Sequence, residues 1–195
     1  MPPYQQNYQE TFEIESKNKP RDINILNQIF KNRYRIFPTE DELFQYNDCD
    51  MVARSLEKPF DTRYTYYIDR KTSKKKAREW FIFEPYIQYP PKEKFKSWSL
   101  HIPAGGSTIL NKFLIAFLDQ EQAVIVRRDK MIPIIELIEK ERPDLIKIHE
   151  EFNETGKRNI KYIIPLPRNH KYLKMMNPII FKMDRRGCFI KQNNF

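Results

Sequence analysis

The chain of 195 residues is poor in glycine and cysteine and lacks any long apolar run. Its two cysteines, Cys49 and Cys188, lie far apart and form no CxxC pair, which excludes a disulfide framework and a cluster held by four thiolates. The longest strongly apolar run, Phe113–Leu118, is far shorter than the roughly 20 residues that cross a bilayer, so no transmembrane segment is predicted. The first residues carry neither the apolar region of a signal peptide nor the arginines of a typical transit peptide.

Proline, aromatic residues and basic charge are abundant instead. The chain has 14 prolines against four glycines, 14% aromatic residues and a formal net charge of +9. Its apolar content of 40% argues against global disorder, and many prolines with few glycines favour extended segments that lie along partners. The positive charge favours an acidic partner such as RNA, an acidic protein face or anionic lipid, without choosing among them.

The N-terminal third is predicted to be an arm followed by helices. Residues 1–20 are polar and contain prolines, which is typical of an extended arm. Apolar residues at i, i+4 then predict a helix that Asp22 caps. Thr39 and Glu42 form a capping box for a second helix, which extends to Leu56. The whole chain then divides into an extended arm, a helical segment, an α+β core and a C-terminal part with a helix, an edge strand and a basic tail (residues 1–20, 21–60, 61–140 and 141–195).

A basic hairpin is predicted after this helical segment. Residues 62–69 alternate between apolar and polar side chains, and residues 78–85 are the expected partner strand. Single-strand nucleic-acid binders combine such basic charge with aromatic stacking, whereas a lysine-rich tip also protects a sheet edge from pairing. Both interpretations stay open. The residues that would contact a partner or a nucleic acid are Lys71, Lys74, Lys75, Lys76 and Arg78.

Two assignments fit the apolar region that follows. In the first, Ser107 caps a helix that reaches Leu118 and is followed by a strand at Ala123–Val126. In the second, the strand is Lys112–Leu118 and a helix follows at Asp119–Lys130, with a further strand after it. Short apolar runs do not decide between helix and strand by period alone.

The C-terminal third has a clearer pattern. Residues 144–154 predict a helix that Gly156 ends. Residues 159–167 predict a strand, which its prolines limit to a sheet edge or a strand end. The last 28 residues mix basic and apolar side chains without a period and are expected to pack as a tail.

No catalytic, cofactor-binding or metal-binding residues are predicted. Structural zinc sites use ligands paired at short spacing, and the possible ligands are all isolated: His101, His149, His170, Cys49 and Cys188. A nucleophile elbow is missing, and the glycine pair near Ser107 matches no phosphate-binding loop. The acidic pairs Asp48/Asp50 and Glu150/Glu151 fall on the predicted helical surfaces.

One motif of metal-dependent nucleases is approached but not matched. Such enzymes commonly carry Pro-Asp followed by Glu-x-Lys. Here Pro143 and Asp144 are followed by Glu154 and Lys157, whose separation is one residue too long. Pro-Asp is also simply a favourable helix start.

Residues 61–140 resemble a family of respiratory complex I subunits, the iron–sulfur protein subunit 4 family of NADH:ubiquinone oxidoreductase. The chain and the family share the order of their elements. An arginine-containing strand is followed by a tryptophan strand ending in Phe-Glu-Pro, a second tryptophan and an apolar strand. The family's Gln-Ser-Gly is replaced by Lys71–Lys76. The matching positions are Arg63, Trp80, Phe83, Glu84, Pro85, Trp98, Phe117, Glu121, Ala123 and Val124, with Trp80, Phe83, Trp98, Phe117 and Ala123 expected in the core.

The resemblance implies an α+β fold, with a small antiparallel sheet packed against the helix at Asp119–Lys130, together with N-terminal helices and extended arms. It also implies a non-catalytic accessory subunit that braces the NADH-oxidising module on the matrix side of the mitochondrial inner membrane. That role needs no cofactor, and its partners would be other subunits of a large complex. The alternative hypothesis is an RNA-associated protein, such as a mitoribosomal accessory subunit, that uses the basic tip.

Overall fold

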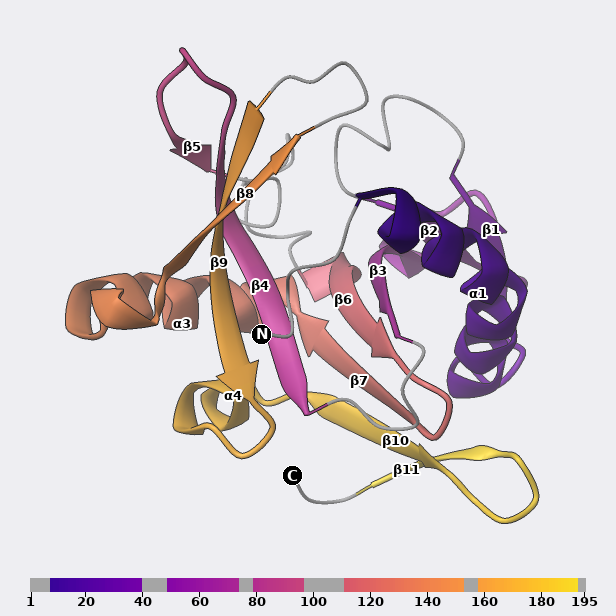
Figure 1. The fold of residues 1–195 in the computed structure, drawn as a ribbon. Helices are drawn as coiled ribbons and strands as arrows, with labels where there is room; N and C mark the ends of the chain where they lie inside the picture. The colour runs from indigo at the N-terminus through magenta and orange to yellow at the C-terminus, as the bar shows by residue number, and fades with distance from the viewer. Residues whose placement is uncertain (1–7, 40–48, 74–78, 97–110, 153–157, 193–195) are drawn as a thin grey trace.

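The fold consists of two β-sheets and a few helices (Figure 1). The computed structural model describes residues 8–39, 49–73, 79–96, 111–152 and 158–192. The larger sheet has seven strands in the order β1-β2-β3-β6-β7-β10-β11. These strands are β1 (Tyr34–Pro38), β2 (Met51–Ser55), β3 (Thr65–Thr72), β6 (Phe113–Leu118), β7 (Gln122–Arg127), β10 (Ile179–Met183) and β11 (Phe189–Lys191). All neighbours are antiparallel except β3 and β6, which are parallel.

The smaller sheet has four antiparallel strands in the order β5-β4-β9-β8. They are β5 (Phe95–Lys96), β4 (Trp80–Gln88), β9 (Arg158–Pro167) and β8 (Lys147–Phe152). The α-helices are α1 (Tyr8–Ile29), α3 (Arg128–Glu141) and α4 (Lys171–Met175), and short 3₁₀ turns lie at η1 (Thr62–Tyr64) and η4 (Pro143–Leu145). This mostly-β architecture overturns the expected small antiparallel sheet on one helix.

Both faces of the larger sheet are covered where β6 and β7 lie. Every residue of β6 is buried, and so is all of β7 except Arg127. Ala116 and Leu118 on one face pack in a core with Leu26 of α1. Phe117 on the other face packs in a second core with α3, α4, β4 and β9. A strand buried on both faces is apolar throughout and loses the alternation typical of a half-buried strand.

Each assignment of the 107–140 region is half right. The strand that the second assignment places at Lys112–Leu118 is β6, which begins one residue later at Phe113. β7 covers the strand at Ala123–Val126 that the first assignment predicts. The helix expected at Asp119–Lys130 is wrong, because Asp119 closes the β6–β7 turn. Its backbone N–H donates to the Gln122 carbonyl oxygen at 2.9 Å, and its Oδ2 accepts from Gln122 Nε2 at 3.0 Å.

Three other helix and arm predictions are wrong. Residues 8–20 belong to α1 rather than to an extended arm, and residues 51–55 form β2 rather than a helix. The predicted helix at 144–154 is the 3₁₀ turn η4 followed by β8. In the last two cases a sheet partner overrides the local periodicity, since β2 pairs with β1 and β3 while β8 pairs with β9. The capping residue Glu42 lies outside the described residues.

The expected hairpin of residues 62–69 and 78–85 does not form, although both segments contain strands. β3 belongs to the larger sheet and β4 to the smaller one. β3 instead pairs with β2 and β6, and β4 pairs with β5 and β9. The two strands are therefore connected along the chain but separated by the division into sheets.

The prolines of β9 act at one end of the strand, as predicted. β9 lies between β4 and β8, but β8 reaches only as far as Ile163. Pro165 and Pro167 lie beyond that point, where the strand has only β4 as a neighbour. A missing N–H costs no ladder bond on the unpaired side. The predicted tail joins the larger sheet as β10 and β11.

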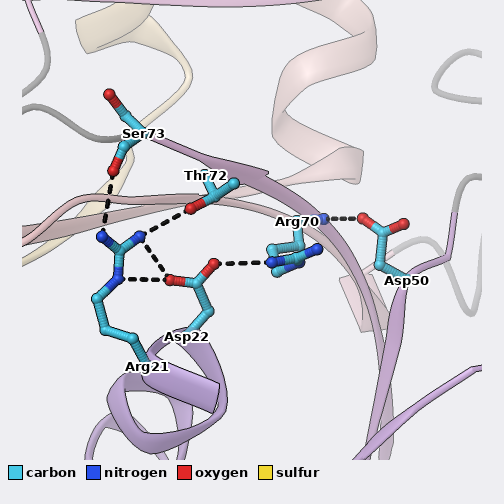
Figure 2. Close-up of polar contacts among 6 residues, drawn as sticks. All are labelled: Arg21, Asp22, Asp50, Arg70, Thr72 and Ser73. Atoms are coloured by element: carbon cyan, nitrogen blue, oxygen red, sulfur yellow. Dashed lines mark hydrogen bonds and ion pairs between the residues drawn. The ribbon is translucent and has the colours of Figure 1, made fainter. Parts of the chain in front are cut away.

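A buried ion network ties α1 to β3 (Figure 2). Asp22 lies inside α1 rather than at its start, and its carboxylate is fully buried. Asp22 Oδ2 accepts from Arg70 Nη1 at 2.9 Å, and Asp22 Oδ1 accepts from Arg21 Nε at 2.9 Å. Arg21 Nη2 also donates to Thr72 Oγ1 at 2.7 Å, and Arg21 Nη1 to the Ser73 carbonyl oxygen at 3.2 Å. Both guanidinium groups therefore hold the end of β3 against the helix.

Replacing Asp22 with alanine is expected to lower the free energy of unfolding by about 3–5 kcal/mol, because it leaves the Arg70 guanidinium buried without its counter-charge. Urea denaturation followed by circular dichroism measures this. Asp144→Ala is the matched control, since that carboxylate pairs with Arg142 at 2.7 Å on the surface and its loss should lower the free energy of unfolding far less. Equal, small losses in both variants would contradict a structural role for the network.

Candidate functional site

The face of β3 opposite α1 carries a second set of charges. Ile68, Arg70 and Thr72 point toward α1, since Ile68 packs with its apolar side chains and the other two bind its Arg21–Asp22 pair. Because successive side chains of a strand alternate between faces, Asp69 and Lys71 point to the other side of the sheet. Lys71 Nζ lies 3.2 Å from Asp69 Oδ1.

Asp50 brings another carboxylate beside Asp69. Met51 pairs with Ile68 in the β2–β3 register, and the Asp50 N–H donates to the Ile68 carbonyl oxygen at 3.0 Å. Asp50, which directly precedes β2, therefore adjoins β3 at Ile68. Asp50 Oδ2 accepts from the Arg70 backbone N–H at 2.7 Å, as Figure 2 shows. This bond fixes the orientation of the Asp50 carboxylate against β3.

The charges continue from β3 onto the smaller sheet. Lys71 Nζ lies 3.8 Å from Glu84 Oε1, on β4. Lys161 Nζ, on β9, lies 3.5 Å from Glu84 Oε2. We call these five residues, Asp50, Asp69, Lys71, Glu84 and Lys161, the charge row. It connects the two sheets and alternates in sign from Asp69 onward.

Electrostatics within the charge row favour the ionised carboxylate of Glu84. The Lys71 ammonium, with smaller contributions from Lys161 and His149, lowers the pKa of Glu84 to about 2 against the effect of burial.

The pKa of the Cys49 thiol is raised. Burial raises it to about 12, and the nearby charges of Asp50 and Asp69 add to the rise. Cys49 is therefore a protonated thiol at neutral pH and not a nucleophile.

The donor atoms at this site suit one class of metal ion. Among the residues that the structure describes, no group of three or more His, Cys, Asp or Glu side chains is arranged to hold a metal. Asp69 on β3 and Asp50, which binds the backbone N–H of Arg70 next to it, each carry a carboxylate, a hard oxygen ligand. Mg²⁺ is commonly bound by one or two carboxylates together with waters and a substrate phosphate. The pair thus fits Mg²⁺ or Mn²⁺ shared with a phosphate, and it does not fit a structural zinc site.

Glu154 and Lys157 do not match the spacing in which one residue separates an acidic residue from a lysine. Asp69 and Lys71 do have this spacing. Residues 153–157 lie outside the described residues, and Asp144 binds Arg142 on the surface. The sequence reasoning missed the site because it placed Asp50 on a helix. The available signal was a strand pattern over residues 65–72, which sets Asp69 and Lys71 on one face.

The structure describes only part of the predicted contact surface and core. Lys71 belongs to the charge row, whereas Lys74, Lys75, Lys76, Arg78 and Trp98 lie outside the described residues. Phe83, Phe117 and Ala123 are buried as expected. Trp80 is 39% exposed, so its expected place in the core is wrong. The alternation of β4 turns Phe81 and Phe83 inward and Trp80 outward.

Comparison with known proteins identifies no relative: no protein-family model, curated protein or solved structure matches the chain significantly. None of the helices in the described ranges combines the length and the apolar character needed to cross a bilayer. The resemblance to a complex I subunit therefore stays a prediction.

Glu84 is expected to make stability depend on pH below its ordinary pKa of 4.5. Because its pKa falls to about 2 on folding, its contribution is fully present above pH 4.5 and is lost as the pH falls toward 2. Glu84→Gln should therefore be less stable than the wild type at neutral pH, and the difference should shrink across this window. Urea denaturation at steps of pH measures it.

Glu150→Gln is the matched control, since Glu150 pairs with Arg158 while both side chains are about half exposed. Its effect should be small at every pH. A Glu84→Gln difference that does not change between pH 4.5 and 2 would show that the charge row does not act on folding in this way.

Proposed function

We propose that the protein hydrolyses phosphodiester bonds in nucleic acids with the help of a divalent cation, and that the charge row is its active site. The observation that supports this most directly is the Lys71 ammonium 3.2 Å from Asp69 Oδ1, with the Asp50 carboxylate bound nearby to the Arg70 backbone N–H. Two carboxylates and an ammonium group supply cation binding and stabilisation of developing phosphoryl charge.

The two aspartates would hold the cation. Asp50 is oriented by the Arg70 N–H, and Asp69 is the residue before Arg70 on β3. When bound, the cation supplies Lewis-acid activation of the phosphoryl group and of water. The hydrogen bond to Arg70 ties Asp50 to the strand that carries Asp69.

Lys71 would stabilise the negative charge that develops on the phosphoryl oxygens. Its ammonium lies between Asp69 on its own strand and Glu84 on β4. The two carboxylates hold the Lys71 ammonium in position between them. Glu84 in turn is held ionised by Lys71 and Lys161. Preorganised charges of this kind act in the transition state without reorganising.

A nucleic acid is the substrate class that agrees with the charge of the chain. The net charge of +9 attracts a polyanion at long range. The proposal agrees with the RNA-associated hypothesis that the partner is a nucleic acid. It adds that the protein hydrolyses this partner. The accessory-subunit role implied by the complex I resemblance remains a separate prediction, and it differs in expecting no hydrolysis.

The decisive test is a nuclease assay with the purified chain. Supercoiled plasmid, linear duplex DNA, single-stranded DNA and single-stranded RNA are incubated with Mg²⁺, with Mn²⁺ or with EDTA. We expect cleavage of at least one substrate that EDTA abolishes. Asp69→Asn and Lys71→Ala should each reduce the rate by at least about 100-fold, while far-ultraviolet circular dichroism stays unchanged.

The matched control is Asp61→Asn, which removes an exposed carboxylate paired with Arg63 and should leave cleavage unaltered. Calorimetric titration with Mn²⁺ gives a second readout, since Asp69→Asn should weaken binding and Asp61→Asn should not. Absence of both cleavage and Mn²⁺ binding would reject the proposal. Recovery of the protein from native membranes with NADH dehydrogenase activity, but no nuclease activity, would favour the accessory role.

A further inference from the structure

The first two strands of the larger sheet carry an unusual pair of arginines. Arg35 on β1 lies directly opposite Arg54 on β2. Both guanidinium groups also lie over the ring of Phe37, at 5.1 Å and 6.0 Å from its centroid. All three side chains are exposed, with Phe37 at 36%. Two cations and one aromatic ring thus form a single basic aromatic patch on the surface.

This arrangement is unfavourable for the isolated protein. Like charges directly opposite on paired strands destabilise a sheet. Arg35 and Arg54 form no ion pair with an acidic side chain among the residues in the described ranges. Other exposed arginines do have such partners, for example Arg142 with Asp144 and Arg158 with Glu150. The patch therefore has the charge complementary to an anionic ligand.

The patch lies on the same side of the sheet as the charge row. Ile36 and Ala53 point toward α1, so their neighbours Arg35 and Arg54 point away from it. Asp50 directly precedes β2 and lies four positions before Arg54. At about 3.3 Å per residue, the two Cα atoms are about 13 Å apart. A chain bound at the patch can thus extend toward Asp50.

Aromatic and basic side chains are also exposed on the β2–β3 connection, which follows β2 along the chain. Phe60 is 97% exposed. The Lys58 ammonium lies over the Tyr64 ring, 4.7 Å from its centroid. Charge beside exposed rings is the composition with which proteins bind single strands, because every unpaired base can stack on an aromatic face. A duplex keeps its bases stacked internally and offers no such face.

We infer that the Arg35–Phe37–Arg54 patch binds single-stranded nucleic acid. The two guanidinium groups bind phosphates and Phe37 stacks on a base. The bound strand then extends toward the charge row. The inference rests on the proposed function for its direction toward Asp50. The binding surface itself needs no cation and no hydrolysis.

Fluorescence anisotropy of a labelled oligothymidylate in EDTA tests the binding surface apart from catalysis. The double variant Arg35→Ala/Arg54→Ala should weaken binding at least about 10-fold and reduce the slope of log K against log salt by about 1.4, since two phosphate contacts on a single strand are lost. Phe37→Ala should weaken binding about 10-fold with the slope unchanged, and Phe37→Tyr should restore it. Arg142→Ala/Arg158→Ala is the charge-matched control and should change neither quantity.

Each result decides a different point. Equal losses in the two double variants would overturn the inference, because charge alone would then explain binding. Duplex DNA bound as tightly as the oligothymidylate, with the same dependence on Phe37, would overturn the single-strand assignment. Normal binding and cleavage in the patch variants would overturn the inference while leaving the proposed function intact. Patch-dependent binding without cleavage and without Mn²⁺ binding would support the surface and reject the proposed function. Thermal unfolding of each variant confirms that it is folded.

Discussion

Asp22 places a negative charge between two guanidinium groups at the interface of α1 and β3. The carboxylate is fully buried, and the Arg70 side chain that it binds is nearly so. Such a pair is costly to separate once formed, since either partner alone would be a buried charge. Arg70 lies between Asp69 and Lys71 in sequence, so the bond that fixes its side chain on one face also fixes the backbone that carries the site on the other. The contact with α1 thereby sets the positions of Asp69 and Lys71, which lie on the opposite face of β3.

The second constraint is the double burial of β6 and β7. One face contacts α1 and the first strands, and the other contacts α3, α4 and the smaller sheet. Phe81 and Phe83 of β4 both pack edge-to-face on Phe117, with ring centroids 5.1 Å and 5.4 Å apart. Edge-to-face aromatic pairs add directional packing to area burial. This packing fixes β4 against the larger sheet, and Glu84 on that strand lies within reach of Lys71 for the same reason.

The elements that could be predicted from sequence are those with a local signature. Residues 62–69 alternate between apolar and polar side chains, and β3 covers most of them. Residues 158–167 combine β-branched side chains with prolines at the end of β9 that only β4 pairs. Phe113–Leu118 gave no decisive period because both of its faces are buried. The helix at Asp119–Lys130 was wrong because Gln122 closes a turn through its side chain, an interaction that periodicity does not register.

The candidate site was beyond sequence reasoning for a related reason. Asp50 and Asp69 are nineteen positions apart in the numbering and are brought near each other only by the β2–β3 register and the hydrogen bond from the Arg70 N–H to Asp50. Because β2 was expected to be a helix, that register could not be anticipated. The basic aromatic patch depends on the same pairing, since Arg35 and Arg54 are neighbours only across β1 and β2.

The parallel pairing of β3 with β6 has a consequence for how this chain is divided. Parallel neighbours need a long crossover connection, and here that connection contains β4 and β5, half of the smaller sheet. The other half, β8 and β9, comes after α3, and the chain then returns to the larger sheet with β10. A cut between β4 and β6 would separate β3 from its parallel partner and β4 from β9 at once. The two sheets are therefore interleaved along the chain. Any contiguous fragment that contains all the strands of one sheet also contains strands of the other.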